Sequence, residues 1–322
     1  MTERAGRHAA GRDLADTLII PAQRDGPSVE STADGDPAPR AAGRHASENG
    51  HAELPNGKPR SDQPARSDHE IPVTAPAAGQ RAQPGGDRKL RLIWVYPDLL
   101  STYGDRGNLL VLSRRAQLRG IEVEATEVNS DQPVPSQGDI YLLGGGEDLP
   151  QILAANRLRA DGGLARAAAG GAVIFAVCAG YQLIGDTFGG VEGEPVDGLG
   201  ILDISSGRGE RRGVGEIVAE VDPALGVPRL TGFENHQGVT RIGSGARPLA
   251  RVSLGVGNGD GTEGAYAGKV LGTYLHGPAL ARNPGLADLL LSWAVGQMRP
   301  LAPDAEDWAG RLRAERLAAV DR

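Results

Sequence analysis

Hydrophobic and polar positions change character abruptly at Lys89. Residues 1–88 are rich in glycine, proline and charged side chains and show no apolar repeat. Such a segment would bury too little apolar surface to offset the conformational entropy that the chain loses when it becomes ordered. We therefore expect a disordered N-terminal extension over residues 1–88, a folded domain over 89–300 and a C-terminal helix over 301–322.

The first half of the folded part alternates between short apolar runs and stretches of helical periodicity. The apolar runs predict buried strands at 90–96, 139–143 and 172–177, and an alternating pattern predicts a further strand at 121–128. The helical periodicity predicts helices at 108–119 and 151–169. Strands and helices that follow one another in this way are typical of an α/β sandwich around a mostly parallel sheet.

The second half has a different pattern. Short strand candidates at 215–221, 247–255 and 270–274 are separated by glycine-rich turns, and residues 284–298 have the pattern of a helix that covers the sheet. This arrangement predicts further strands at the edge of the sheet, with more antiparallel character.

The composition of the chain excludes several classes of function. The net charge is -7, from 34 Lys and Arg against 41 Asp and Glu, and no basic block supports nucleic-acid binding. The N-terminus lacks the apolar core of a secretory signal, and no apolar run approaches the roughly 18 residues of a membrane span. We expect a soluble, cytoplasmic protein. A single cysteine excludes a cysteine-based zinc cluster, and the scattered histidines of residues 1–88 do not suggest a metal site.

That single cysteine, Cys178, is either a buried inert thiol or a nucleophile. It follows the buried strand 172–177, and the small residues Ala179 and Gly180 lead from it into a helix. This is the pattern of a nucleophile elbow, in which a sharp turn exposes the side chain above the carboxyl edge of a sheet. The start of the helix also favours the thiolate. The context therefore favours a catalytic cysteine.

A catalytic thiol needs a base, and the folded part contains only His236 and His276. His276 ends the strand-like run 270–275, which brings it to the same edge of the sheet as Cys178. His236 stands in a stretch that reads as a polar loop. We favour His276 as the base.

Acyl transfer also needs two backbone N–H groups aimed at the developing oxyanion. Ala179, directly after the nucleophile, is one candidate donor. Gly145, in the glycine triplet 144–146 at the end of a neighbouring strand, is the other, because glycine permits the backbone angles required.

At these residues the chain resembles the class I glutamine amidotransferases, in the branch related to cobyric acid synthase. The segments that carry the resemblance are 103–108 (Y-G-D-R-G-N), 143–148 (L-G-G-G-E-D), 178–182 (C-A-G-Y-Q), 198–203 (G-L-G-I-L-D), 232–238 (G-F-E-N-H-Q-G) and 271–278 (L-G-T-Y-L-H-G-P). The resemblance implies a flavodoxin-like three-layer sandwich with a mostly parallel central sheet. Within the branch the chain looks like the glutaminase subunits of lipid II isoglutaminyl synthases.

The resemblance implies that Cys178 attacks the side-chain amide of L-glutamine and that His276 moves the protons. Arg212 matches a position that binds glutamine in relatives, where a guanidinium suits the α-carboxylate. The neighbouring Arg211 leaves the register of that match open.

The resemblance also implies a heterodimer with a Mur-ligase-like ATP-dependent subunit. That partner would use the ammonia to convert the α-carboxyl of D-glutamate in lipid II to D-isoglutamine. The chain has no G-x-x-x-x-G-K-[ST] run, so we expect no cofactor here and assign ATP and Mg²⁺ to the partner.

One position departs from the family pattern. Many class I amidotransferases carry a glutamate two residues after the histidine, and this chain has Pro278 there. The site is then a Cys-His dyad, or a partner supplies the acid. Two other functions stay open: an ammonia donor for cobyrinate-type amidation, and a non-catalytic glutamine-binding regulatory subunit.

Overall fold

The computed structural model describes residues 89–320, apart from the side chains of 303–307. The predicted extension 1–88 lies outside the described residues. The strands are β1 (Leu90–Val95), β2 (Val123–Val128), β3 (Ile140–Leu143), β4 (Val173–Val177), β5 (Thr187–Gly189), β6 (Pro195–Asp197), β7 (Ile204–Val221), β8 (Leu230–Ile242), β9 (Arg247–Leu254), β10 (Thr262–Ala267) and β11 (Val270–Thr273). The helices are α1 (Arg106–Gln117), α2 (Asp148–Asp161), α3 (Gly163–Ala169), α4 (Ala179–Leu183), α5 (Ala279–Arg282), α6 (Pro284–Val295) and α7 (Pro303–Val320), with a 3-10 turn at Pro223–Leu225.

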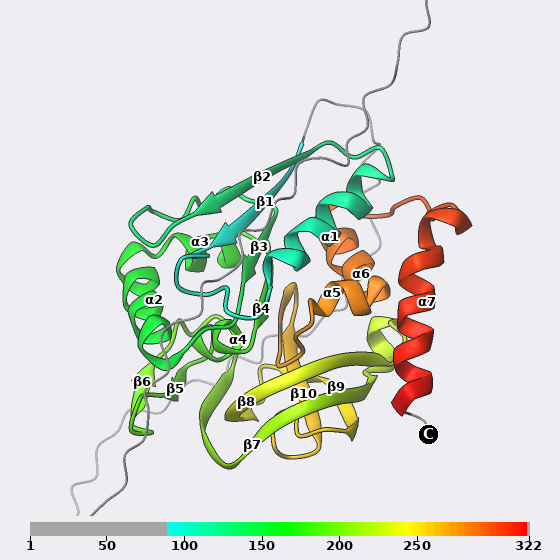
Figure 1. Ribbon diagram of the computed structural model, residues 1–322. Coiled ribbons are helices and arrows are strands. Elements are labelled where there is room, and N and C mark those ends of the chain that lie inside the picture. Colours follow the sequence, from blue (N-terminus) through cyan, green and yellow to red (C-terminus); the bar gives the residue numbers. More distant parts are fainter. Residues whose placement is uncertain (1–88, 321–322) are drawn as a thin grey trace, which may run out of the picture. The chain divides into compact units, whose positions relative to one another are not determined.

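Five parallel strands form one half of the sheet, in the order β2-β1-β3-β4-β11. Every residue of β3, β4 and β11 is buried. Helices α1, α5 and α6 lie on one face of this half, and α2, α3 and α4 lie on the other (Figure 1). Strands covered on both faces must be apolar throughout, which explains their continuous hydrophobic runs.

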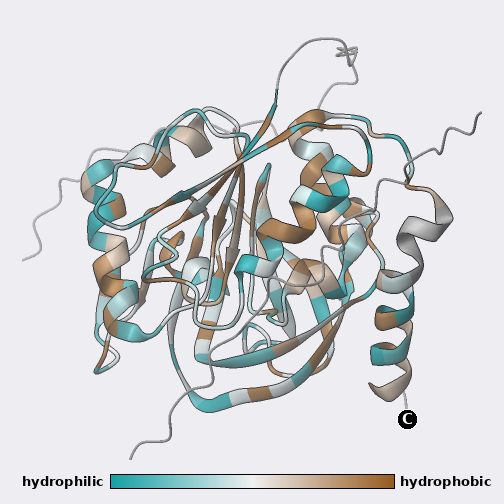
Figure 2. Ribbon diagram, turned by 45° about the horizontal axis from the view of Figure 1, so that its top comes forward, coloured by the Kyte–Doolittle hydropathy of each residue, from teal (hydrophilic) through white to brown (hydrophobic). Residues whose placement is uncertain are grey.

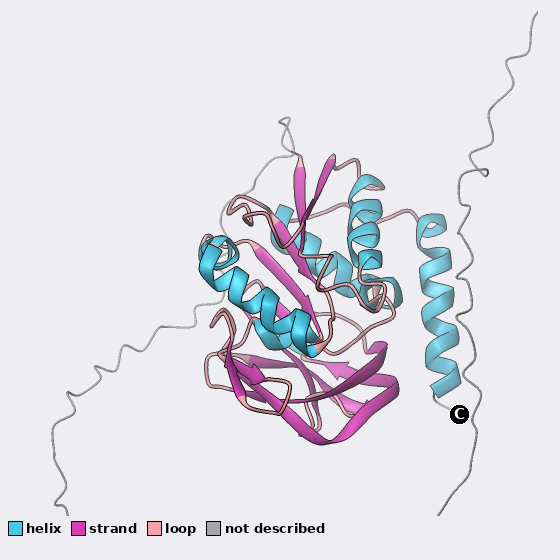
Figure 3. Cartoon of the chain, turned by 60° about the vertical axis from the view of Figure 1, so that its left-hand side comes forward, coloured by secondary structure: helices cyan, strands magenta, loops and turns pink. Residues whose placement is uncertain are grey.

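Beyond β11 the sheet continues with antiparallel pairs. β10 pairs with β11 and β9, β9 pairs with β7, and the long strands β7 and β8 pair along most of their length. These strands form the sheet region away from most of the helices (Figure 3). Strands β7 to β10 therefore have the antiparallel character that the sequence predicts. The prediction of an edge strand at 270–274 is wrong, because β11 lies inside the sheet and pairs in parallel with β4.

The hydropathy of the chain matches this layering. The central strands are hydrophobic, whereas the helices α1 and α2 present hydrophilic residues on their outer turns (Figure 2). The core includes large rings that are fully buried, among them Phe175 on β4, Tyr181 on α4 and Tyr274 after β11. Tyr181 and Tyr274 meet edge to face, with ring centroids 5.2 Å apart.

The predicted α/β sandwich with a largely parallel central sheet is confirmed, and so are the four strands expected in the first half. The helix predicted over 151–169 is two helices, because Gly162 adopts the left-handed conformation (φ 66°) that ends α2. The prediction of a polar loop around His236 is wrong: this residue lies inside β8. Within residues 89–320, no helix is long and apolar enough to cross a membrane.

The close packing of α4 on β11 makes a prediction about Gly272. A Cβ at this position would lie 1.9 Å from Cδ2 of the buried Tyr181. We expect Gly272→Ala to lower the free energy of unfolding by about 1–3 kcal/mol, since Tyr181 cannot move without disturbing the core. Urea denaturation measures this. Gly207→Ala on β7, where a Cβ meets nothing within 4 Å, is the control. Equal effects of the two substitutions would contradict the packing described here.

Candidate active site

Cys178 occupies a strained corner between β4 and α4. Its φ of 53° lies in the left-handed region, which residues other than glycine rarely adopt. Such a residue costs on the order of 1–3 kcal/mol and persists where the surroundings enforce it. Here the Cys178 N–H donates to the carbonyl of Thr273 on β11, at 2.8 Å. The corner is therefore fixed by the same pairing that joins β4 to β11.

The small residues after the nucleophile are required by the space available. A Cβ on Gly180 would lie 2.8 Å from Cβ of Leu143 and 2.9 Å from the carbonyl oxygen of Gly144. The Gly180 N–H also donates to that Gly144 carbonyl, at 3.1 Å. The elbow thus sits directly on the glycine loop that ends β3, as the motif C-A-G predicts.

His276 lies on the other side of that glycine loop. A Cβ built on Gly145 would lie 2.9 Å from Cε1 of His276 and 3.4 Å from Cβ of Cys178. Both side chains therefore lie next to Gly145. The backbone of His276 is bridged to Phe233 of β8, with its N–H donated to the Phe233 carbonyl at 2.8 Å. The imidazole is 1% exposed and tilts against the ring of Tyr103. The structure therefore brings Cys178 and His276 together.

His236 has a different environment. Its ring stacks on Tyr274, with centroids 3.8 Å apart and an interplanar angle of 10°. Nδ1 lies 2.9 Å from the carbonyl oxygen of Gly238, and Nε2 lies 3.4 Å from the carboxylate of Glu234. Both ring nitrogens of His236 thus have partners. A histidine held in this way supports the wall of the pocket.

The resting thiol is not the thiolate that a helix N-terminus was expected to favour. Burial, followed by the negative charge of Asp105, raises the pKa of the Cys178 thiol to about 12, although a hydrogen bond from the Ala179 N–H acts in the opposite direction. Helix α4 has five residues, so its dipole is small beside the cost of a buried charge. At neutral pH the sulfur carries its proton until a base removes it.

The two predicted oxyanion donors differ. The Ala179 N–H faces the sulfur of Cys178, where it lowers the pKa of the thiol. The Gly145 N–H does not match the prediction, because it is donated to Oδ2 of Asp105 at 2.7 Å. The Gly145 carbonyl accepts the N–H of Thr102 at 3.2 Å, so both ends of this residue are held by the 102–105 loop.

Asp105 is a site residue that the sequence analysis missed. It is 3% exposed, and its Oδ1 lies 3.8 Å from Nδ1 of His276. An aspartate just before a helix ordinarily reads as an N-cap, which conceals any chemical role. Here the side chain makes no capping hydrogen bond with α1. Only its position within the Y-G-D-R-G-N segment, which also marks the family, gives a signal in the sequence.

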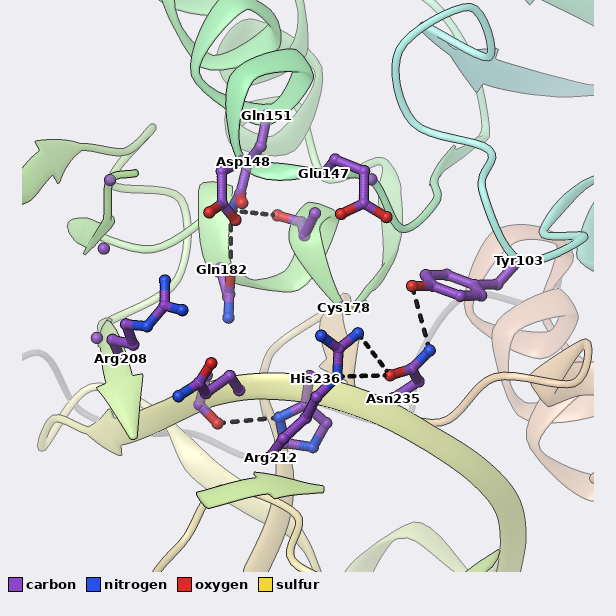
Figure 4. Close-up of a pocket in the computed structure, with 17 residues that line it drawn as sticks. Tyr103, Glu147, Asp148, Gln151, Cys178, Gln182, Arg208, Arg212, Asn235 and His236 are labelled. Carbon is purple, nitrogen blue, oxygen red and sulfur yellow. Dashed lines mark hydrogen bonds between the residues drawn. The ribbon is translucent and has the colours of Figure 1, made fainter. Parts of the chain in front are cut away.

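A pocket opens over Cys178, and side chains from distant segments line it (Figure 4). Arg212 on β7 donates from Nε and Nη2 to Oδ1 of Asn235, at 3.0 and 2.8 Å. Asn235 in turn donates to the hydroxyl of Tyr103, at 3.3 Å. Arg212 therefore lines the pocket in a fixed orientation, whereas its neighbour Arg211 does not border it. Of the two adjacent arginines, Arg212 is therefore the one placed to meet a molecule in the pocket.

Charges of opposite sign face each other across this pocket. Glu147 and Asp148, at the start of α2, form one wall, and the guanidinium groups of Arg208 and Arg212 lie on the opposite side (Figure 4). Gln182 lines the same space and is held by hydrogen bonds with Gln151 and Tyr274. Except for Arg212, the sequence analysis assigned none of these residues, because their segments meet only in the folded chain.

Comparison with known proteins gives the family. A model of the CobB/CobQ-like glutamine amidotransferase domain matches residues 91–284, more than half of the chain. The chain belongs to this family. It is accordingly a glutamine amidotransferase domain with glutaminase chemistry, and the Cys178 corner and the pocket above it lie within the matched residues.

Relatives within the family include two that carry the same subunit name. The chain is 36% identical over 239 residues to "Lipid II isoglutaminyl synthase (glutamine-hydrolyzing) subunit GatD" of Staphylococcus aureus, which covers 73% of the chain and 96% of that protein. It is 32% identical over 212 residues to the Streptococcus pneumoniae protein of that name, with 64% and 81% covered. A cobyric acid synthase of Sphingopyxis alaskensis is 34% identical over 209 residues, but only 41% of that longer protein is covered.

Solved structures of glutamine amidotransferases are also similar. One shares 24% identity, a TM-score of 0.44 and coverage of 63% of this chain and 98% of its own. A Thermotoga maritima glutamine amidotransferase shares 15% identity, with a TM-score of 0.43, and covers 70% of this chain and 94% of its own.

In the part of the chain that the structure describes, no three His, Cys, Asp or Glu side chains gather in a metal-binding arrangement.

The protonated state of Cys178 predicts how the isolated chain reacts with iodoacetamide. Because a pKa of about 12 leaves only a small thiolate fraction at neutral pH, we expect the alkylation rate to rise about tenfold per pH unit through pH 9. Cys178 is the only cysteine, so mass spectrometry of the intact chain reports this site alone. A plateau between pH 6 and 8 would instead indicate a stable thiolate–imidazolium pair.

Proposed function

We propose that this glutamine amidotransferase is the glutaminase subunit of a lipid II isoglutaminyl synthase. The observation that carries the proposal is the share of each relative that the alignment covers. The chain aligns with 96% of the S. aureus subunit at 36% identity, but with only 41% of a cobyric acid synthase. The domain stands by itself in the first relative and is one part of a longer protein in the second. The alignment thus spans nearly the whole of the first relative and less than half of the second.

The site supports a covalent mechanism with Cys178 as nucleophile. His276 removes the thiol proton as the sulfur attacks the side-chain amide carbon of L-glutamine, and the Ala179 N–H stabilises the oxyanion. The tetrahedral intermediate collapses to a thioester, and the proton on His276 passes to the ammonia that leaves. Water, deprotonated by His276, then hydrolyses the thioester and releases glutamate.

The charge distribution of the pocket suits the head group of free glutamine. The α-carboxylate would bind the guanidinium of Arg212, which Asn235 already orients. The α-ammonium would face Glu147 and Asp148 on the opposite wall. A zwitterion that spans the two walls would hold its side-chain amide above Cys178, which fits an amino-acid substrate.

The second half of the reaction would take place on a partner. We assign ATP and Mg²⁺ to a Mur-ligase-like subunit, because the chain contains no P-loop run. That subunit would activate the α-carboxyl of D-glutamate in the stem peptide of lipid II. Ammonia released from glutamine at Cys178 would then replace the leaving group of the activated carboxyl and give D-isoglutamine.

Co-expression with the ligase subunit tests the proposal. We expect the wild-type complex to release glutamate and form D-isoglutamine in lipid II when glutamine and ATP are supplied. Cys178→Ala should abolish both with glutamine, since no thioester can form. The same variant complex should still amidate lipid II when ammonium chloride replaces glutamine. Mass spectrometry of the stem peptide and a glutamate assay measure these products.

Different failures have different meanings. Equal glutamate release by the wild type and Cys178→Ala would remove the glutaminase mechanism and favour a regulatory glutamine-binding subunit. Amidation of a cobyrinate substrate but not of lipid II would favour cobyrinate-type amidation. The identity of the ATP-dependent ligase that co-purifies with the chain checks the partner independently.

The binding role of Arg212 makes a second prediction. A charge-assisted hydrogen bond contributes about 1.5–3 kcal/mol, so Arg212→Gln should raise KM for glutamine by roughly 10- to 150-fold. We expect kcat to change much less, because Arg212 does not contact the sulfur. Arg211→Gln, the adjacent control, lies outside the pocket and should leave KM within about twofold of the wild type. Similar KM values for both variants would contradict the assignment.

A further inference from the structure

Two buried polar groups behind Cys178 face each other without hydrogen bonds. Oδ1 of Asp105 and Nδ1 of His276 lie 3.8 Å apart, and neither atom has a hydrogen-bond partner among the described residues. Both side chains are about 2% exposed. A buried polar atom without a partner costs about 1–3 kcal/mol, so its retention calls for a physical reason.

We propose that Asp105 is the positioning residue of His276: its carboxylate orients the imidazole through Nδ1 and stabilises the imidazolium formed during glutamine hydrolysis. Asp105 would take the role of the glutamate that many class I amidotransferases carry where this chain has Pro278. The acid would then come from this chain and not from a partner. It rests on the proposed base role of His276, and the test below separates the two.

The carboxylate is fixed for this role. Oδ2 of Asp105 accepts the Gly145 N–H at 2.7 Å, which leaves Oδ1 directed at the imidazole. A Cβ on Gly144 would lie 2.8 Å from the same Oδ2, so the glycine loop packs closely around the acid. The ordinary use of an aspartate before a helix does not apply, because no capping hydrogen bond is made.

Other buried acids near the site are already engaged. Glu234 accepts the N–H groups of Val256 and Gly257 and pairs with His236. Oε1 of Glu263 accepts the hydroxyl of Thr273 and the N–H of Tyr274. Its Oε2 has no hydrogen-bond partner among the described residues, but the ion pair found at His276 is with Asp105. Within residues 89–320, Asp105 is the carboxylate found within 4 Å of an imidazole nitrogen of His276.

In the proposed reaction Asp105 neither gains nor loses a proton. Neutral His276 carries its hydrogen on Nδ1, toward Asp105, and so presents the lone pair of Nε2 to the thiol. Transfer of the Cys178 proton to Nε2 creates an imidazolium, whose Nδ1–H stays with the carboxylate. Nε2 then gives that proton to the departing ammonia, and His276 returns to its starting tautomer.

Two variants of Asp105 separate positioning from simple support of the glycine loop. Asp105→Asn keeps an oxygen that accepts the Gly145 N–H but turns an amide N–H₂ toward Nδ1, which stabilises the wrong tautomer. We expect kcat for glutamine hydrolysis to fall on the order of 10²- to 10⁴-fold, with KM nearly unchanged. Asp105→Ala removes both interactions and should lose at least as much. The assays use the chain in complex with its ligase subunit.

The control is Asp98→Asn, in the same connection between β1 and α1. Asp98 is exposed and accepts hydrogen bonds from Ser130, away from the pocket, so wild-type kcat is expected. Wild-type kcat in Asp105→Asn with a loss in Asp105→Ala would overturn the proposal, because Asp105 would then only hold the loop. If His276→Gln also retained wild-type kcat, the assignment of the base would fail as well.

The tautomer gives a readout that a purely structural role would not change. In long-range ¹H–¹⁵N spectra of the imidazoles, assigned with His276→Gln, we expect the Nδ1–H form in the wild type and the Nε2–H form in Asp105→Asn. An unchanged tautomer in the folded Asp105→Asn variant would also overturn the proposal. Thermal melting of each variant establishes that the compared proteins are folded.

Discussion

The parallel pairing of β4 with β11 is the constraint on which the site depends. In its register Val177 lies opposite Thr273, so the residues that follow both strands emerge at the same edge of the sheet. The Cys178 N–H extends the pairing by one bond, to the Thr273 carbonyl, and holds the residue at positive φ. His276 follows three residues after Thr273 and is fixed from its other side by the bridge to Phe233. Two strands nearly a hundred residues apart in the sequence thus define the distance between nucleophile and base.

Burial keeps the Cys178 thiol protonated in the resting site. The low dielectric that raises the pKa of Cys178 also strengthens each hydrogen bond made to a developing charge. A neutral thiol is the state of Cys178 that such an environment favours. Charge then appears only as glutamine reacts, and groups already in position around the sulfur receive it.

The parallel half of the fold could be predicted because β1, β3 and β4 are buried and consist mainly of apolar residues, whereas the exposed edge strand β2 shows alternation. The elbow at Cys178 and the histidine at the end of β11 follow from the same rule that ligand sites form at carboxyl strand ends. Strands β7 and β8 were harder to predict, since one face is polar and lines the pocket; His236 therefore resembles a loop residue. Asp105 could not be assigned, because its partner His276 is brought to it only by the sheet order β1-β3-β4-β11. The Gly145 N–H was misassigned for the same reason, as its acceptor lies 40 residues earlier.

The antiparallel strands and their turns leave the parallel sheet after Cys178 and return to it at Val270. Everything between these points is an excursion that begins and ends beside the reacting atoms. Arg208, Arg212 and Asn235 all lie in this excursion, so one continuous segment of the chain supplies the basic wall of the pocket. Its two ends join the strands that hold Cys178 and His276.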